Sequence, residues 1–220
     1  MRDRQSGTTE RVSVDSSGAE ANSLSVTASI SADGRFVAFE SSATNLVGAD
    51  TNGAADAFVR DRGAPPGSPF CSGDGSATAC PCGNGAAGKG CPNSVHPSGG
   101  NLAASGTAST TADTLVLTSS GMPNSWALYF QGTTQIASGA GVVFGDGLFC
   151  AGGTVIRLDT QLNSGGTSHY PGAGDTWVSV RGQVTAPAVR TYQVWYRNAA
   201  AFCTPATFNL TNGVEIVWML

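Results

Sequence analysis

The feature that most limits how this chain can fold is a cysteine- and glycine-rich segment over residues 70–100. Its four cysteines follow the pattern C-x8-C-x-C-x8-C, at Cys71, Cys80, Cys82 and Cys91. The segment has so much glycine and so few large apolar residues that it cannot bury a core of its own. Covalent links must therefore hold it in place. With Cys150 and Cys203 the chain has six cysteines, enough for three disulfides.

The spacing of these cysteines suggests how they pair without deciding it. Six cysteines can pair in 15 ways. Two local arrangements fit the equal steps between them (80 − 71 and 91 − 82), namely Cys71–Cys80 with Cys82–Cys91, or Cys71–Cys82 with Cys80–Cys91. Both leave Cys150 and Cys203 to form the third bridge within the second half of the chain. Each bridge would stabilise the fold by about 2–4 kcal/mol.

A zinc site is the alternative use of the same cysteines. Cys80 and Cys82 would supply two ligands, and Cys71, Cys91 or His96 would supply the others. Zinc ribbons, however, place two residues between paired cysteines, whereas one residue separates Cys80 from Cys82. We therefore expect disulfides, which also indicate an oxidising, extracellular environment.

The composition predicts an all-β protein. Glycine accounts for 30 of 220 residues, and 12% of residues are charged, about half the usual share. Such a chain favours short strands joined by tight turns over helices. The net charge is −4 and no basic run occurs, so the sequence argues against nucleic-acid binding. No apolar stretch approaches the roughly 18 residues of a membrane span.

An internal repeat marks the N-terminal part of the chain, residues 1–62. Arg2-Asp3-Arg4 recurs as Arg60-Asp61-Arg62. The interval between the two copies matches the length of one large propeller blade, and a propeller needs several blades. We therefore expect this reading frame to begin inside a longer, secreted protein. No signal peptide is recognisable in this chain, because Met1 is followed by charged and polar residues.

The same N-terminal part predicts a β-meander. Residues 11–15 and 35–40 alternate with a period of two, as half-buried strands do. In the second of these strands, Phe36 and Ala38 share one face, and Val37 and Phe39 share the other. Asp33 and the glycine after it predict a hairpin turn in front of this strand.

Residues 31–39, Ser-Ala-Asp-Gly-Arg-Phe-Val-Ala-Phe, are similar to a known signature. They resemble the Ser-x-Asp-Gly-(Arg/Lys)-x-(Ile/Val)-Ala-Phe motif of TolB-type (PD40, WD40-like) β-propeller blades. The resemblance extends over residues 1–62 and implies a single propeller-type blade there. It implies no catalytic role.

The remaining residues divide into a linker, the cysteine-rich segment and a β-domain. Three prolines make residues 63–69 a stiff linker, and residues 70–100 form the stapled segment. Residues 101–220 show short apolar runs separated by turn residues, which predicts a β-sandwich or jelly-roll-like domain. The predicted strands are 114–118, 126–131, 142–144, 154–159, 176–181, 190–198 and 214–219.

Residues 70–220 resemble a C-terminal module of large secreted proteins from planctomycetes and related environmental bacteria. The similar runs are Gly73–Gly75, Cys80–Asn84, Ala103–Thr107, Tyr129–Gly132 and Tyr192–Arg197. The likeness extends over this whole range. It implies an extracellular or cell-surface location in the natural, longer protein and an all-β fold, but no activity.

Catalytic candidates are few because the chain has two histidines. His169 precedes the turn that contains Asp175, and His96 lies in the cysteine-rich segment. A Ser-His-Asp hydrolase would need one of them as its base, with Asp146, Asp159 or Asp175 as the partner. The sequence has no G-x-S-x-G elbow, so an ordinary turn or surface role is expected for each histidine.

A possible metal site lies at Asp50, Asn52 and Asp56, around Gly53. Three oxygen-bearing side chains at this spacing resemble part of a calcium loop, although the EF-hand spacing and its terminal Glu are lacking. Calcium or another divalent metal is therefore a candidate cofactor. The alternative is an Asx turn that leads into a strand.

Aromatic residues concentrate in the β-domain. Alternation places Tyr192 and Tyr196 on one face of a strand, with Trp195 and Arg197 on the other. One face must be core; the other, if exposed, forms an aromatic platform suited to sugar rings or a partner. The alternative buries both faces between sheets. The candidate binding residues are Trp126, Tyr129, Trp177, Trp195 and Arg197.

Together these patterns favour a secreted, non-catalytic module. It would bind a glycan or another cell-surface component, and it would form homo-oligomers through unpaired strand edges of the blade. The alternative function is a hydrolase, metal-assisted or based on a His/Asp pair, on a β-scaffold. A third possibility is a cytoplasmic protein with reduced thiols.

Overall fold

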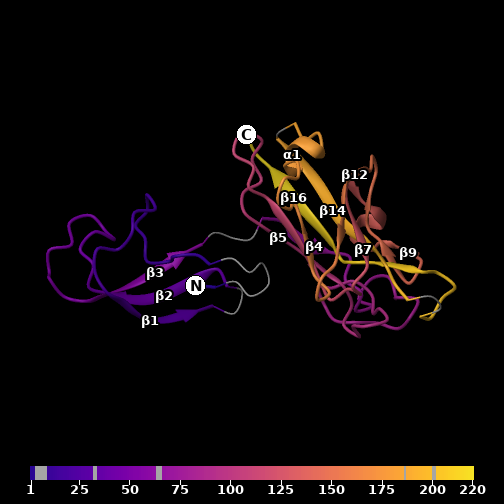
Figure 1. The fold of residues 1–220 in the computed structure, drawn as a ribbon, viewed down its shortest axis with the longest axis horizontal. Coiled ribbons are helices and arrows are strands. Elements are labelled where there is room, and N and C mark those ends of the chain that lie inside the picture. The colour runs from indigo at the N-terminus through magenta and orange to yellow at the C-terminus, as the bar shows by residue number, and fades with distance from the viewer. Residues whose placement is uncertain (3–8, 32–33, 63–65, 186, 200–201) are drawn as a thin grey trace. The chain divides into compact units, whose positions relative to one another are not determined.

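A computed structural model describes residues 1–2, 9–31, 34–62, 66–185, 187–199 and 202–220. The protein is all-β and divides into two compact units, Met1–Pro65 and Pro66–Leu220 (Figure 1). The cysteine-rich segment belongs to the second unit, together with the strands that follow it.

The first unit contains a three-stranded antiparallel β-meander. Its strands lie in chain order, β1 (Ser25–Ile30), β2 (Phe36–Ser41) and β3 (Asp56–Asp61). The alternation expected from the sequence is confirmed in β2, where Val37 and Phe39 are buried while Phe36 and Ala38 are exposed. Phe39 stacks on Phe58 of β3 with 5.7 Å between ring centroids, which begins a small core for this unit.

Part of what the sequence predicted for this unit lies outside the described residues, namely Asp3 and Arg4 of the repeat and Asp33 of the hairpin turn. The second copy of the repeat ends β3, where the Asp61 carboxylate accepts hydrogen bonds from Nε and Nη2 of Arg35, both at 2.8 Å. Residues 11–15 form an isolated bridge, between Val14 and Glu20, rather than the predicted strand.

The second unit is built on an antiparallel six-stranded sheet. Five strands follow the order β12-β7-β14-β16-β4, and β15 pairs with the C-terminal part of β14. The strands are β4 (Ser68–Phe70), β7 (Trp126–Gly132), β12 (Ile156–Leu162), β14 (Ala188–Arg197), β15 (Phe208–Leu210) and β16 (Gly213–Trp218). β14 has ten residues and pairs with three neighbours, so it is the centre of the sheet.

A smaller antiparallel sheet has the order β13-β6-β5. It contains β5 (Asn101–Ser105), β6 (Val116–Ser120) and β13 (Ser168–Tyr170). Between β7 and β12 the chain forms two further short pairs and a single turn of 3-10 helix. These are β8 (Thr134–Gln135) with β11 (Ala151–Gly152), β9 (Val142–Phe144) with β10 (Gly147–Phe149), and η1 (Ile136–Gly139).

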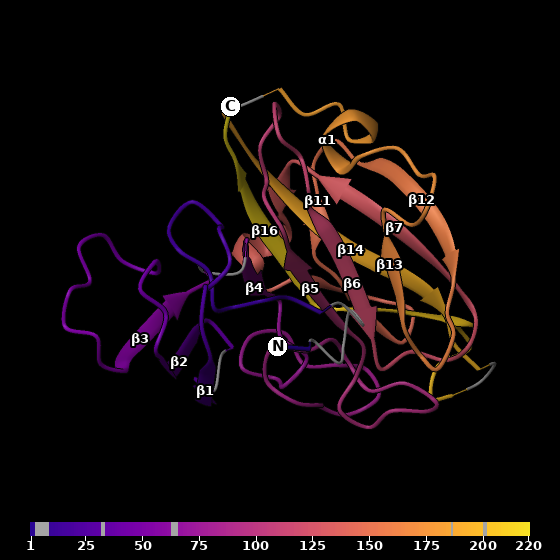
Figure 2. The same ribbon diagram turned by 60° about the vertical axis from the view of Figure 1, so that its left-hand side comes forward.

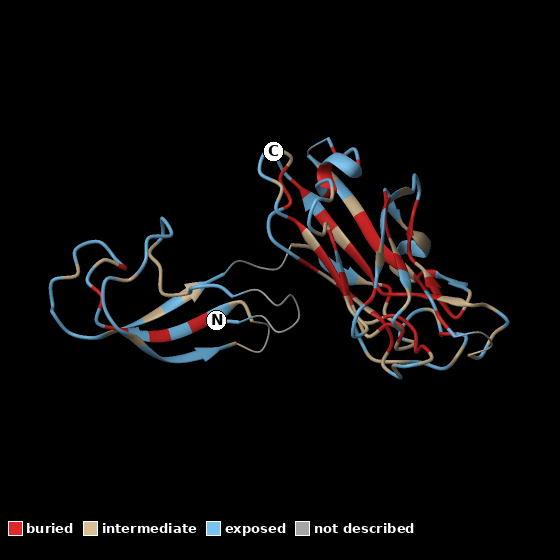
Figure 3. Cartoon of the chain, viewed as in Figure 1, coloured by how far each residue is buried: buried red, intermediate tan, exposed pale blue. Residues whose placement is uncertain are grey.

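The two sheets pack face to face as a β-sandwich. The main core cluster takes Leu117 and Tyr170 from the smaller sheet, and Tyr129, Val194 and Ile216 from the larger one. Figure 2 shows the smaller sheet lying over the larger one, and Figure 3 shows the buried residues concentrated along these strands. Because one face of each sheet supplies this core, the opposite face of each sheet is left for other contacts.

A chain of hydrogen bonds satisfies the polar groups inside the sandwich. The Trp218 Nε1–H donates to the Tyr192 hydroxyl at 2.8 Å, and that hydroxyl donates to Oε1 of Gln131 at 2.8 Å. Gln131 Nε2 in turn donates to the Gly182 carbonyl at 2.8 Å. A buried polar group without a partner would be destabilising, so this chain fixes the arrangement of the core side chains.

All six cysteines are in disulfides, but two of the three bridges differ from the local pairing predicted from the spacing. The bridges are Cys71–Cys150, Cys80–Cys91 and Cys82–Cys203. The Cys80–Cys91 pair of the second arrangement is present, whereas the Cys150–Cys203 pair common to both was wrong. The cysteine-rich segment packs on the β-sandwich, so Cys71 and Cys82 meet partners 79 and 121 residues away. The alternative of a zinc site is also overturned, because no thiol is left to bind metal.

The structure corrects two further boundaries. Residues 176–181, predicted as a strand, end in the single helical turn α1 (Val178–Arg181), because the Gly182 N–H bonds to Val178 O and Asp113 accepts from Ser179 N–H. Ser68 and Pro69, predicted as linker, belong to β4 and pair with β16. Neither helix in the described part of the chain is long and apolar enough to cross a membrane.

The four tyrosines of the chain give a test of this core. Burial raises the pKa of Tyr129, Tyr192 and Tyr196. Burial, with the charges of Asp159 and Asp175, raises the pKa of Tyr170 to about 12. A raised folded-state pKa favours the neutral phenol. Each buried phenol therefore contributes stability that is present below the unfolded pKa of about 10. This stability is lost as the pH rises from there through the raised folded-state pKa.

We predict that the folded protein shows no phenolate absorbance at 295 nm near pH 10, because all four hydroxyls resist ionisation. In denaturant the same four groups should ionise at about pH 10. On raising the pH further, phenolate absorbance and loss of the far-ultraviolet circular dichroism signal should appear together. A tyrosine that ionises near pH 10 while the circular dichroism signal is intact would contradict the packing described here.

Candidate functional site

Aromatic side chains line the outer face of the six-stranded sheet, the face turned away from the sandwich core. In β7, Tyr129 points into the core, so alternation places Trp126, Leu128 and Phe130 on the outer face. In the pairing of β7 with β14, Leu128 lies directly opposite Trp195. We call this surface the outer aromatic face.

The β9–β10 hairpin adds a wall to the outer aromatic face. Phe149 of β10 lies 5.9 Å from Phe130, and Phe144 of β9 lies 5.8 Å from Phe149, between ring centroids. Phe208 continues the series at 4.8 Å from Phe144 and 5.5 Å from Trp195. The five rings thus form a continuous row in which each ring packs against the next, and this packing fixes their orientations.

A hollow of about 440 Å³ lies between this hairpin and the sheet. Its size falls in the range typical of small-molecule sites. Arg157 is the charged residue of its lining, and Phe144 at its mouth is 47% exposed. The lining residues are Leu128, Phe130, Phe144, Phe149, Val155, Arg157, Trp195 and Leu210.

The outer aromatic face extends beyond the hollow. Trp126 and Leu162 are cross-strand partners and are 56% and 60% exposed. The guanidinium carbon of Arg197 lies 5.2 Å from the centroid of the Trp195 ring, and its Nη1 donates to Thr207 Oγ1 at 3.0 Å. The face therefore combines exposed apolar rings with fixed hydrogen-bond donors, the combination that a ligand with apolar faces and polar edges requires.

The candidate binding residues divide between this face and other places. Trp126, Trp195 and Arg197 come together on the outer aromatic face. Tyr129 lies on the core face instead, where its hydroxyl is hydrogen-bonded to Ser168 Oγ at 3.0 Å. Trp177, exposed by 53%, directly precedes α1, whose first residue Val178 belongs to the sandwich core, and it does not line the hollow. Tyr129 is an odd number of residues from Trp126, so a continuous strand cannot place both on one face.

The catalytic candidates are separated from one another. His169 is exposed on β13, while the Asp175 carboxylate accepts hydrogen bonds from Gln161 Nε2 and Gly172 N–H, both at 2.8 Å. His96 Nδ1 lies 2.9 Å from Ser98 Oγ. Within the described ranges no hydrogen bond joins either imidazole to a carboxylate, so the third member of a Ser-His-Asp arrangement is not in place there.

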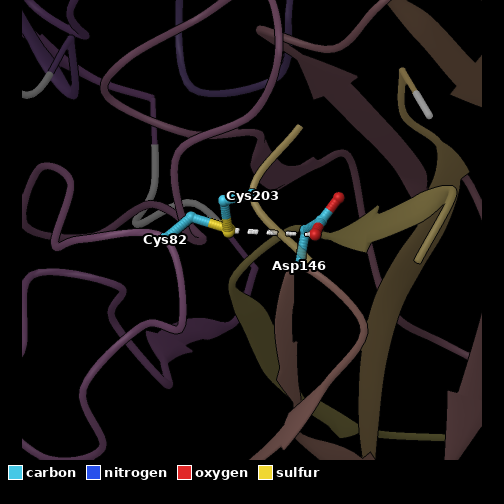
Figure 4. Close-up of side chains that lie close together, drawn as sticks. All are labelled: Cys82, Asp146 and Cys203. Atoms are coloured by element: carbon cyan, nitrogen blue, oxygen red, sulfur yellow. Dashed lines mark hydrogen bonds between the residues drawn. A yellow bond between two sulfur atoms is a disulfide. The ribbon is translucent and has the colours of Figure 1, made fainter. Parts of the chain in front are cut away.

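Asp146 is fully buried beside the Cys82–Cys203 disulfide (Figure 4). Its Oδ2 accepts from Asn198 Nδ2 at 2.9 Å, and its Oδ1 accepts from the Thr204 hydroxyl at 2.6 Å. Its Oδ1 lies 3.8 Å from Cys82 Sγ and 4.0 Å from Cys203 Sγ. These sulfurs are bonded to each other and carry no hydrogen, so the contacts are van der Waals contacts. The group forms no thiolate metal site, and Asp146 anchors the turn between β9 and β10.

The candidate calcium loop contains the Asx turn that the sequence allowed. Asn52 Oδ1 accepts the Ala54 N–H at 2.8 Å, and Asn52 Nδ2 points to the Asp56 carboxylate at 3.2 and 3.3 Å. Asn52 therefore directs its nitrogen, rather than its oxygen, toward Asp56. A cation between these two residues would require the amide to turn over.

The sequence analysis missed Phe149 and Phe208, which help to wall the outer aromatic face. A signal was present, because a turn at Gly145-Asp146-Gly147 between apolar pairs is typical of a hairpin. Gly145 has φ +63°, and a Cβ there would lie 2.3 Å from the Phe208 ring. The turn therefore needs glycine both for its backbone conformation and for the close approach of Phe208.

Comparison with known proteins adds no identification. No family model matches the sequence, and neither the curated proteins nor the solved structures give a match.

Proposed function

We propose that this protein is a secreted, non-catalytic binding module that holds carbohydrate on the outer aromatic face. The observation that carries the proposal is the hollow between β9–β10 and the sheet, lined by Phe144 and Trp195. Sugar rings present apolar C–H faces and hydroxyl edges. Aromatic rings would receive the faces, while Arg157 and Arg197 would donate hydrogen bonds to the edges.

The three disulfides support a location outside the cytoplasm. Bridges across 79 and 121 residues persist in oxidising compartments and are rare in reducing ones. The resemblance to the C-terminal module of secreted planctomycete proteins agrees with this location. A cell-surface glycan would then be accessible to the module.

Binding is favoured over hydrolysis by the arrangement of the titratable groups. A hydrolase needs a base held by an orienting group next to a substrate pocket. In the described part of the chain, no histidine or carboxylate lines the hollow on the outer aromatic face. We therefore assign the aromatic hollow to recognition rather than to chemistry.

The first unit supports a role in assembly. Its sheet order β1-β2-β3 makes β1 an edge strand, and Val26 and Ile30 on β1 are 43% and 51% exposed. Edge strands with exposed apolar residues pair readily with other chains. We propose that copies of the chain associate through this edge, in keeping with the resemblance of residues 1–62 to one blade of a propeller.

We predict that the purified protein is retained on an insoluble β-linked polysaccharide, such as cellulose or chitin, and that Trp195→Ala weakens this binding at least tenfold. The loss corresponds to about 1.4 kcal/mol and reflects removal of the one indole that lines the hollow among the described residues. Phe144→Ala, at the exposed mouth of the hollow, should weaken binding in the same direction.

Trp177→Ala is the matched control, because it also removes an indole but one that does not line the hollow. It should bind as the unchanged protein does. Circular dichroism should confirm that each variant is folded. Equal binding by the Trp195 and Trp177 variants, or no binding to any polysaccharide tested, would contradict the proposed function.

For assembly, we predict that sedimentation equilibrium shows a concentration-dependent increase in mass. Val26→Lys should shift the protein toward the monomer, because a charge on an edge strand opposes pairing. Val180→Lys, at an exposed valine of the second unit, is the control and should leave association unchanged. A single monomeric species at all concentrations would contradict association through β1.

A further inference from the structure

A second hollow lies on the smaller sheet. Asn101 of β5 and Ser120 of β6 are directly paired and contribute to its lining. The loop from Lys89 to Gly99 and the residues after β6 form its walls, and its volume is about 490 Å³. The hollow is therefore separate from the outer aromatic face, which belongs to the larger sheet.

Lys89, the chain's one lysine, lines this hollow on a fixed backbone. Its carbonyl accepts the Gly73 N–H at 2.7 Å, and its own N–H donates to Ala86 O at 3.3 Å. The next residue, Gly90, packs so closely that a Cβ there would lie 2.4 Å from Leu210 O. Cys91 then joins Cys80 in a disulfide. The loop is held on both sides of Lys89, so ordering the backbone costs little when a ligand binds.

His96 is also held in position. The Asn93 Oδ1 accepts the His96 N–H at 2.9 Å, and Asn93 Nδ2 donates to the Tyr196 hydroxyl at 3.0 Å. Ser98 Oγ lies 2.9 Å from Nδ1 of the imidazole, and the ring lies against Gly121. In the part of the chain that the structure describes, His96 Nε2 has no hydrogen-bond partner.

Two side chains of this hollow offer hydrogen-bond donors, Asn124 and Lys89. Asn124 uses its Oδ1 to accept the Gly166 N–H at 2.7 Å, which leaves its NH₂ group to donate. Lys89 adds an ammonium group, and the ion pairs found among the described residues do not include it. Among the described residues no Asp or Glu lines the hollow, although the chain as a whole carries a net charge of −4.

The same sheet face carries the second histidine of the chain. His169 of β13 is directly opposite Thr118 of β6, two residues from Ser120. Tyr170 and Leu117 point into the core, so alternation places His169 on the face that bears the hollow. Both histidines and the one lysine are thus associated with one face of the smaller sheet.

We infer that this hollow binds a small anionic molecule through its oxyanion group, a carboxylate, sulfate or phosphate. Lys89 supplies the charge, and His96 and Asn124 supply directed hydrogen bonds to the oxygens. A volume of about 490 Å³ exceeds that of a bare ion and suits a ligand of monosaccharide size. The inference is independent of the carbohydrate site, because the two hollows share no residue.

The test is protection of Lys89 from acetylation, followed by mass spectrometry. The α-amino group of Met1 is the chain's other primary amine and serves as the internal control. At low ionic strength, glucuronate, sulfate and phosphate are the anionic probes, and glucose is the neutral one. At least one anion should slow acetylation of Lys89 severalfold without affecting Met1, with a dissociation constant near or below about 1 mM, whereas glucose should not. Which anion protects identifies the oxyanion.

Variants separate a site from a general charge effect. Calorimetric titration with the protecting anion should show at least tenfold weaker binding for Lys89→Gln and His96→Gln, while Lys89→Arg stays within a few fold. Arg190→Gln changes the net charge equally on a strand of the other sheet and should bind as the unchanged protein does. Trp195→Ala should also bind the anion normally, even if it no longer binds polysaccharide.

Three results would overturn the inference. One is the lack of protection by any of the three anions, and another is equal protection by glucose. The third is equal loss of binding in Lys89→Gln and Arg190→Gln, which would indicate a general charge effect.

Discussion

Two disulfides attach a segment with no core of its own to the β-sandwich, a third closes a loop within that segment, and both hollows of the second unit depend on the attachment. Cys71–Cys150 ties the start of the segment to the residue after β10, and Cys82–Cys203 ties its middle to the loop before β15. Bridges that close such long loops lower the conformational entropy of the unfolded chain. In the loop-closure model each bridge thereby stabilises the folded state by about 4–5 kcal/mol. Apolar burial within the segment could not replace them.

Both hollows take a wall from this attachment. Phe149, on the outer aromatic face, directly precedes Cys150. Lys89 lies two residues before Cys91, and the buried Asp146 connects the hairpin turn to the loop that contains Cys203. Inside the sandwich core, the polar groups of Tyr192 and Gln131 are hydrogen-bonded to each other, so neither needs a partner from the cysteine-rich segment. The outer faces of the two sheets are therefore available for ligands of different chemistry.

Local patterns in the sequence predicted much of the secondary structure. The alternation of Val37 and Phe39, the strand at Val142–Phe144 and the all-β class follow from side-chain periodicity and turn residues. The same alternation separates Trp195 from Tyr196 on β14. Applied to the strand that begins at Trp126, the same alternation would have excluded Tyr129 from the outer aromatic face.

What could not be predicted depends on positions in space. Cys82 and Cys203 are 121 residues apart, and no spacing rule relates them. The turn of α1 depends on Asp113, which accepts from Ser179 across 66 residues. Likewise, the hollow lined by Lys89 and His96 forms only where the cysteine-rich loop meets the end of β6. Residue spacing and periodicity cannot predict such contacts, because they arise from packing between segments that are distant in sequence.

The disulfide map tests this account most directly. Digestion of the unreduced protein with trypsin and an Asp-specific protease would place the cysteines on peptides 63–73, 74–89, 90–112, 146–157 and 198–220. The structure predicts two linked products, 63–73 with 146–157, and 74–89 with both 90–112 and 198–220. A product that links 146–157 to 198–220, with 63–73 joined to 74–89, would show local pairing. That result would contradict the attachment on which both proposed sites depend.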